Sequence, residues 1–193
     1  MISARLPDLL LDVHVFASEE QVKAITATLK DWLLQLRALE SPYGERVCSF
    51  LGSSYKNPRI RALSRPSLRP SSTLAEFHSQ GCCTVSPAIL ESSERARTLV
   101  EMRADSKYRT HLIHGDIHAG NILADKDFRL TGLVDWEAAA WMPEYWELVT
   151  ARRDGQDEES VWKDVMLDAF PSEYRRELEI DDYADQSGHN TFW

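Results

Sequence analysis

The sequence lacks an excess of positive charge. It contains 22 Lys and Arg residues against 31 Asp and Glu, which gives a formal net charge of −9 over 193 residues. Nucleic acids and anionic membrane surfaces attract basic patches, so this balance argues against both as partners. An acidic protein is compatible with a cationic small molecule, although the charge alone does not select one.

Cysteine is scarce, and long apolar runs are absent. The three cysteines, Cys48, Cys82 and Cys83, are odd in number and form no Cys-x-x-Cys pattern, which is typical of a reducing compartment. The apolar stretch Leu9–Leu11 is too short for a signal peptide, and no run reaches the length of a transmembrane helix. These features predict a cytoplasmic protein.

The overall composition, 43% hydrophobic and 27% charged, is typical of a globular domain with a sizeable core. Apolar residues recur at helical spacing behind the cap-forming Ser18, which predicts a long helix over residues 18–40. Shorter helices are predicted to begin near Ser72, Ser86, Pro143 and Ser160. We expect one domain over residues 1–180 and a frayed tail over residues 181–193.

The chemistry is concentrated in one polar stretch. His114-Gly115-Asp116 is followed five residues after the aspartate by Asn121, and Asp135 ends a later apolar run. Phosphoryl transfer needs an acceptor for the proton of the attacking hydroxyl and ligands for Mg²⁺ on the phosphates. Asp116 suits the first role. Asn121 and Asp135 offer the hard oxygen ligands that Mg²⁺ prefers.

A β-hairpin is predicted between the two candidate metal ligands. Asn121–Ala124 is apolar after its first residue, Asp125–Asp127 is a turn signal, and Arg129–Val134 returns as a second strand. A hairpin brings its two outer ends together, so Asn121 and Asp135 can share one ion.

The chain contains His-Gly-Asp, followed after four residues by Asn-Ile-Leu, and later Val-Asp-Trp-Glu. This pattern resembles the catalytic core of the aminoglycoside phosphotransferase and choline kinase family. The segment Ala140–Glu147 resembles a fungal branch of that family. The resemblance implies a protein-kinase-like fold and ATP-dependent phosphorylation of a small-molecule hydroxyl. It implies that Asp116 is the catalytic base and that His114 braces its loop. It also implies that Asn121 and Asp135 hold Mg²⁺ on the ATP phosphates. One departure is Ala119, where a proline is common in the family.

The sequence before residue 110 lacks a Gly-x-Gly-x-x-Gly pattern and a lysine on an apolar strand. Kinase-like enzymes use both to hold the phosphates. Compared with the family, residues 1–180 are similar to the C-terminal (catalytic and substrate) lobe, with the N-terminal ATP-cradling lobe absent. We therefore expect an α+β, mostly helical fold with a central β-hairpin. The protein is expected to be either a kinase or a binding or regulatory remnant without turnover.

A metal-dependent hydrolase is a further alternative. His111, His114, Asp116 and His118 are close in sequence, and the last three would share a face if they lay on a strand. Histidines and a carboxylate are typical Zn²⁺ ligands. This interpretation leaves Asn121 and Asp135 without a role, so we favour the kinase-like one.

Aromatic residues gather after the second candidate metal ligand, at Trp136, Trp141, Tyr145 and Trp146. Packing in the core is the usual role of such residues. Contact with a cationic substrate through cation–π attraction is the alternative.

Overall fold

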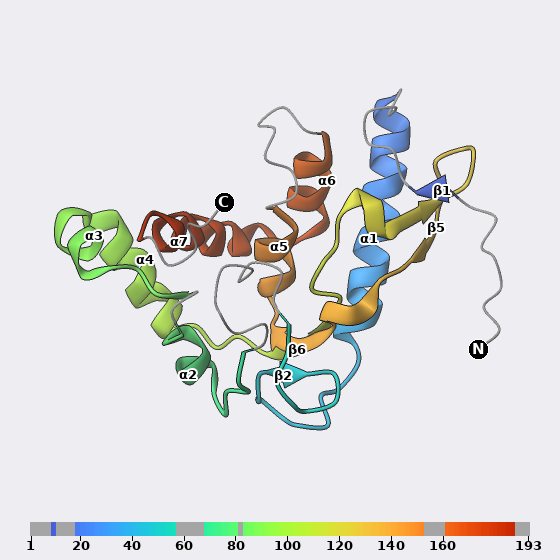
Figure 1. Ribbon diagram of the computed structural model, residues 1–193. Helices are drawn as coiled ribbons and strands as arrows, with labels where there is room; N and C mark the ends of the chain where they lie inside the picture. The colour runs from blue at the N-terminus through green and yellow to red at the C-terminus, as the bar shows by residue number, and fades with distance from the viewer. Residues whose placement is uncertain (1–8, 11–17, 57–67, 81–82, 153–160, 188–193) are drawn as a thin grey trace.

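The computed structural model describes residues 9–10, 18–56, 68–80, 83–152 and 161–187. Within these ranges the chain combines helices with short strands (Figure 1). The α-helices are α1 (Glu19–Arg37), α2 (Leu74–His78), α3 (Pro87–Ser92), α4 (Glu94–Ala104), α5 (Trp146–Ala151), α6 (Val161–Ala169) and α7 (Arg175–Gln186). The strands are β1 (Leu9–Leu10), β2 (Cys48–Ser49), β3 (Thr110–Ile113), β4 (Ile122–Ala124), β5 (Leu130–Leu133) and β6 (Ala140–Pro143). The predicted α+β, mostly helical fold is confirmed.

The strands form two small antiparallel sheets, in the orders β1-β4-β5 and β2-β6-β3. The predicted hairpin is confirmed as β4 and β5, in which Ile122 pairs with Leu133. Strands β3 and β6 were not predicted. Pro143 ends β6 opposite Thr110 instead of opening a helix, and α5 begins only at Trp146.

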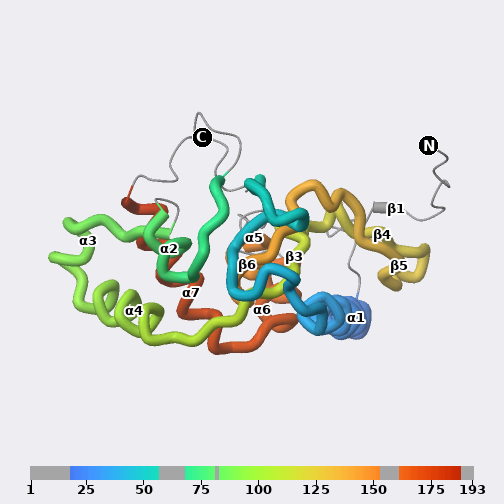
Figure 2. The backbone as a smooth tube through the Cα atoms, turned by 90° about the horizontal axis from the view of Figure 1, so that it is seen from below, coloured from blue at the N-terminus to red at the C-terminus, as the bar shows by residue number. Residues whose placement is uncertain are grey.

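The predicted long helix is confirmed as α1. The Ser18 side chain accepts a hydrogen bond from the Gln21 amide, and Ile25, Leu29 and Leu33 form the buried face. This face packs on α6 and β3. Figure 2 shows α1 and the β4–β5 hairpin on one side of the molecule and the pair α3 and α4 on the other, with β3 and β6 between them.

Two further boundary predictions were wrong. The helix expected from Ser86 is divided, because the Ser93 hydroxyl accepts a hydrogen bond from the Ala96 amide and starts α4 separately. The tail expected to fray from residue 181 continues α7 to Gln186, with Asp181 and Ala184 buried. Residues 188–193 lie outside the described ranges.

A buried polar contact joins α4 to α7. The Arg103 guanidinium donates to Glu177 at 2.6 Å, and the Tyr108 hydroxyl donates to the other oxygen of the same carboxylate at 2.5 Å. Both Arg103 and Glu177 are buried, so each charge depends on its partner. The contact therefore joins α4 and α7 to Tyr108, which lies just before β3, the strand that leads into the site.

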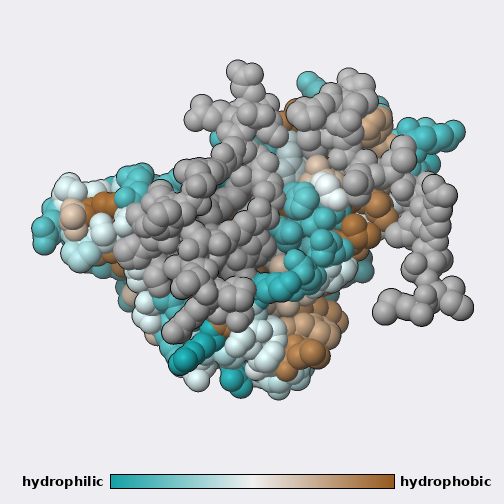
Figure 3. Space-filling model, viewed as in Figure 1, coloured by the Kyte–Doolittle hydropathy of each residue, from teal (hydrophilic) through white to brown (hydrophobic). Residues whose placement is uncertain are grey.

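Most aromatic residues of the predicted cluster belong to the core. Trp141, Tyr145 and Trp146 are buried, whereas Trp136 is 42% exposed. On the face seen in Figure 3 the hydrophobic colour is confined to separate patches among polar residues. Within the described ranges, every helix is too short or too polar to cross a membrane.

Candidate active site

The loop after β3 carries the first group of candidate residues. β3 ends at Ile113, and Gly115 then takes a φ of +85°, which side chains rarely allow. A Cβ atom on Gly115 would lie 2.5 Å from the Ala138 carbonyl oxygen. Only glycine lets the loop approach the 3-10 turn η5 (Trp136–Ala138) this closely.

A buried carboxylate binds the backbone of the same loop. Glu147 of α5 is 1% exposed, and its two oxygens accept hydrogen bonds from the backbone N–H groups of His114 (2.6 Å) and Gly115 (2.9 Å). Burial raises the pKa of Glu147 from 4.5 to about 7, and the two amides oppose that rise. Sequence reasoning gave Glu147 no role. Its one sequence signal is a carboxylate inside the apolar helix segment 145–149.

His114 joins the loop to the end of the hairpin. Its ring is fully buried, and Nε2 lies 2.8 Å from the Val134 carbonyl oxygen, to which an Nε2–H group can donate. Burial lowers the pKa of His114, while Asp116 and Asp135 lie near enough to oppose this with their charges. The Trp136 ring covers it edge-on at 4.7 Å between centroids. A neutral, fixed ring at this point suits the bracing role.

Asp116 and Asn121 lie together. The Asn121 side-chain amide donates to the Asp116 carbonyl oxygen at 2.9 Å and approaches the Asp116 carboxylate at 3.4 Å. The Asn121 backbone carbonyl accepts a hydrogen bond from the Val134 backbone N–H at 2.9 Å. Asp135 therefore follows directly after a residue that is paired with Asn121, as the hairpin prediction required.

Asp135 has an unusual backbone conformation. Its φ and ψ are both 63°, in the left-handed region, which costs a residue with a side chain about 1–3 kcal/mol. Its side chain is exposed, and it forms no hydrogen bond or ion pair with the described part of the chain. Such a carboxylate does little for the stability of the fold and is free to bind a ligand.

The donor set fits a magnesium ion. With its amide nitrogen directed at Asp116, Asn121 has a side-chain oxygen that accepts no hydrogen bond within the described ranges. Asp135 would add an anionic oxygen at an exposed position, which water and phosphate can reach.

The zinc alternative is wrong on geometry. β3 ends before His114, so His114, Asp116 and His118 do not share a strand face. The His111 ring lies 3.7 Å from Glu144, and His114 is directed at Val134. Among the residues that the structure describes, no group of three or more His, Cys, Asp or Glu side chains is arranged to bind a metal.

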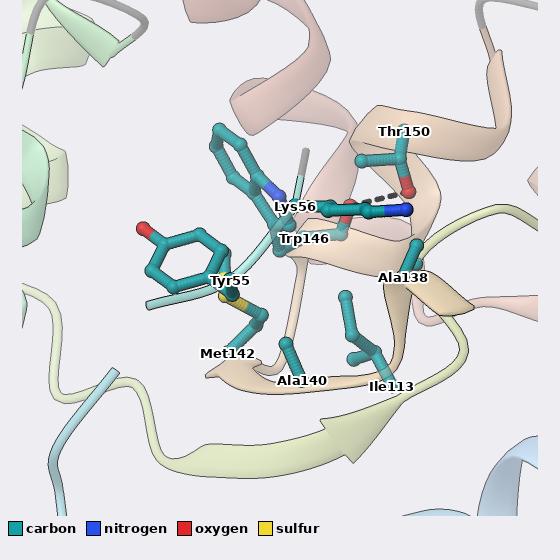
Figure 4. A pocket seen from close by; sticks show the side chains of 9 residues that line it. Tyr55, Lys56, Ile113, Ala138, Ala140, Met142, Trp146 and Thr150 are labelled. Atoms are coloured by element: carbon teal, nitrogen blue, oxygen red, sulfur yellow. Dashed lines mark hydrogen bonds between the residues drawn. The ribbon is translucent and has the colours of Figure 1, made fainter. Parts of the chain in front are cut away.

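Figure 4 shows a pocket beside Gly115. Apolar side chains of β3 and β6 form much of its lining, including Ile113, Ala140 and Met142. Lys56 reaches it and forms an ion pair with Glu137 at 2.5 Å. Both charged side chains are more than half exposed, so this pair contributes at most about 1 kcal/mol. The mainly apolar lining leaves the polar chemistry of the site to the loop and the hairpin end.

The chain is similar to known proteins. The model of the phosphotransferase enzyme family matches residues 5–180. Among solved structures, the chain is similar to the apo form of a thermostable mutant of aminoglycoside phosphotransferase APH(4)-Ia. That similarity has a TM-score of 0.43 and 16% identity, and it covers 95% of this chain and 71% of the other. A search of curated proteins found no match. Because the family match spans most of its length, the chain belongs to the phosphotransferase enzyme family.

Proposed function

We propose that the protein transfers the terminal phosphoryl group of ATP to a hydroxyl group of a small molecule. Membership of the phosphotransferase enzyme family supports the reaction class. The observation that carries the residue roles is the contact of the Asn121 amide with Asp116, combined with the pairing of Asn121 and Val134. Through these contacts the candidate base and both candidate metal ligands lie around one loop and one hairpin end.

Asp116 is the proposed base. It stands on a loop held by Glu147 and by the fit of Gly115 against Ala138, so its carboxylate is positioned before the substrate arrives. Asp116 takes the proton of the attacking hydroxyl, while His114 keeps the loop against the hairpin. Positioning of this kind supplies much of the catalysis in phosphoryl transfer.

Asn121 and Asp135 are the proposed magnesium ligands. A bound magnesium ion supplies positive charge that offsets the negative charge of the phosphate oxygens. The strained backbone of Asp135 directs a free carboxylate to this end of the hairpin, and its cost is consistent with a functional role.

The acceptor is proposed to be a small molecule, and a cationic one fits the rim of the site. Trp136 presents a partly exposed ring there, next to Asp135, the proposed magnesium ligand, and to Glu137, which is paired with Lys56. An aromatic face attracts a cation. We place the reaction in the cytoplasm, in accord with the thiol of Cys48, which forms no disulfide.

The experiment is a phosphotransfer assay on the purified protein. ATP and Mg²⁺ are supplied with a panel of aminoglycosides, amino alcohols and neutral alcohols, and phosphorylated product is detected by ³¹P NMR. Asp116→Asn is expected to lower turnover by a factor of about 100 or more, because it removes the base with little change of shape. Asp127→Asn is the matched control, since Asp127 lies exposed on the hairpin turn.

Two results would count against the proposal. Retention of most of the rate by Asp116→Asn would remove this residue from the role of base. Binding of ATP and Mg²⁺ without turnover for any acceptor would favour the alternative, a binding or regulatory protein.

A further inference from the structure

We propose that His118 is a second catalytic group of this site, whose Nε2–H donates a hydrogen bond to the phosphoryl group during transfer. The inference rests on the proposed function and adds a residue to it. The position and orientation of the ring carry the argument.

The ring of His118 has a defined orientation. The Gly120 backbone N–H donates to His118 Nδ1 at 3.1 Å, at the start of the 3-10 turn η4 (Ala119–Asn121). A nitrogen that accepts a hydrogen bond carries no proton, so the proton of the neutral ring is assigned to Nε2. The hydrogen-bond donor of the ring therefore lies on the side away from the turn.

Gly120 provides the space in which the ring sits. A Cβ atom on Gly120 would lie 2.9 Å from His118 Cε1 and 3.0 Å from Nδ1, so a larger residue at this position would displace the ring. The backbone beside the ring is also paired, because the Asn121 backbone N–H donates to the His118 carbonyl at 2.9 Å. The turn and the Gly120 hydrogen bond thus orient the ring before any ligand binds.

The donor nitrogen of the ring lies near the candidate base. His118 Nε2 lies 3.9 Å from the Asp116 carboxylate, beyond the range of about 2.7–3.2 Å for a direct hydrogen bond. The two side chains are 32% and 23% exposed, so both can be reached from solvent. Asp116 is also contacted by Asn121. A reacting group placed beside Asp116 is therefore within reach of the imidazole N–H.

The reaction step balances with His118 in this role. The acceptor hydroxyl oxygen forms a bond to the terminal phosphorus of ATP, and the bond from that phosphorus to the bridging oxygen breaks. The electron pair of the broken bond leaves with ADP, and the hydroxyl proton passes to Asp116. His118 keeps its proton and donates a hydrogen bond to a non-bridging oxygen of the moving phosphoryl group, where negative charge lies.

A matched pair of substitutions separates this role from that of a turn cap. In His118→Asn the side-chain oxygen can replace Nδ1 as the acceptor for Gly120, but nothing replaces Nε2–H. We expect kcat to fall by about 10- to 1,000-fold, as for other lost donors to a transition state, while KM and the unfolding temperature change little. His118→Gln places an amide N–H nearer the Nε2 position and is expected to recover part of the rate.

A spectroscopic measurement tests the contact without turnover. In protein with ¹⁵N-labelled histidine, the Nε2–H signal of His118 is assigned through its loss in His118→Asn. It is followed with ADP and Mg²⁺ alone, and then with aluminium fluoride added as a mimic of the moving phosphoryl group. The proton resonance is expected to shift only with the mimic.

The outcomes distinguish this inference from the function on which it rests. Two results would show that the ring only caps the turn: a wild-type kcat in His118→Asn, or an Nε2–H resonance that does not shift when the mimic is added. Absence of transfer by the wild-type protein would instead overturn the proposed function, and the spectroscopic measurement would still decide the position of His118.

Discussion

Replacement of Glu147 by glutamine is the most informative change at the base of the loop. The two oxygens of the carboxylate accept the N–H groups of His114 and Gly115. Glutamine has nearly the same shape but one acceptor oxygen, so its NH₂ group must face one of the two amides. One hydrogen bond is lost and one buried N–H is left unsatisfied, which costs about 1–3 kcal/mol.

The sign of the stability change depends on pH. Burial raises the pKa of Glu147 from its ordinary value of 4.5, which applies to the unfolded chain, to about 7 in the folded one. Between these values the folded protein holds a proton that the unfolded chain has released, so rising pH favours unfolding. The stabilisation is complete below the lower value and is lost as pH rises through the upper one. At about 1.4 kcal/mol per pKa unit, the loss is roughly 3 kcal/mol.

Wild type and Glu147→Gln should therefore differ in opposite ways at low and high pH. Near pH 5 the variant is expected to be about 1–3 kcal/mol less stable, because an amide replaces a protonated acid with poorer hydrogen bonding. Near pH 8 the wild type has lost roughly 3 kcal/mol through ionisation of Glu147, whereas glutamine does not ionise and loses nothing, so the variant equals or exceeds the wild type. Its kcat should still fall by a factor of about 10–100, because the loop that carries Asp116 shifts.

Urea unfolding at several pH values measures the first effect, and steady-state kinetics measures the second. Glu177→Gln is the matched control, because Glu177 is an equally buried carboxylate that contacts Arg103 and Tyr108 instead of the loop. The control should lose stability and keep kcat in its folded fraction. A stability difference between wild type and Glu147→Gln that is the same at both pH values would refute the electrostatic reasoning. Full kcat in Glu147→Gln would refute the positioning role.

Two further changes test the backbone of the site. Gly115→Ala is expected to destabilise the protein by more than about 2 kcal/mol in urea unfolding, because its Cβ meets the Ala138 carbonyl at a positive φ. Gly132→Ala, whose Cβ has ordinary contacts, should be nearly neutral. Asp135→Gly should leave stability unchanged or raise it by up to about 1 kcal/mol, since it relieves the left-handed backbone. The same change should remove most phosphotransfer in the product assay, and an active Asp135→Gly protein would contradict the metal assignment.

The elements that were predicted from sequence depend on local signals. Helix α1 has an apolar stripe within its own 19 residues, and its cap, Ser18, directly precedes them. The hairpin has two apolar segments separated by a three-residue turn signal, with Asp125 accepting backbone hydrogen bonds from Asp127 and Arg129. In both cases the interacting residues are near one another in the chain, so a single sequence reveals them.

The missed elements depend on partners that are distant in sequence. Strands β3 and β6 pair across about 30 residues, and each has only four residues. Neither strand alternates apolar and polar residues in a way that marks it, because both are largely buried. In α7 the acidic residues around Ile180 resembled a solvated tail, yet Ile180 and Ala184 pack on Leu99.

The candidate site divides in the same way. Its chemical groups could be predicted because their residue types and spacing suit one reaction. Its supports could not, because they are contacts between the loop and three other elements: the Glu147 carboxylate of α5, the Ala138 carbonyl of η5 and the Val134 carbonyl beyond β5. Each support touches the backbone or ring of residues 114–115. The position of Asp116 is therefore set by groups with no chemical role, and changes in them should act on kcat more than on nucleotide affinity.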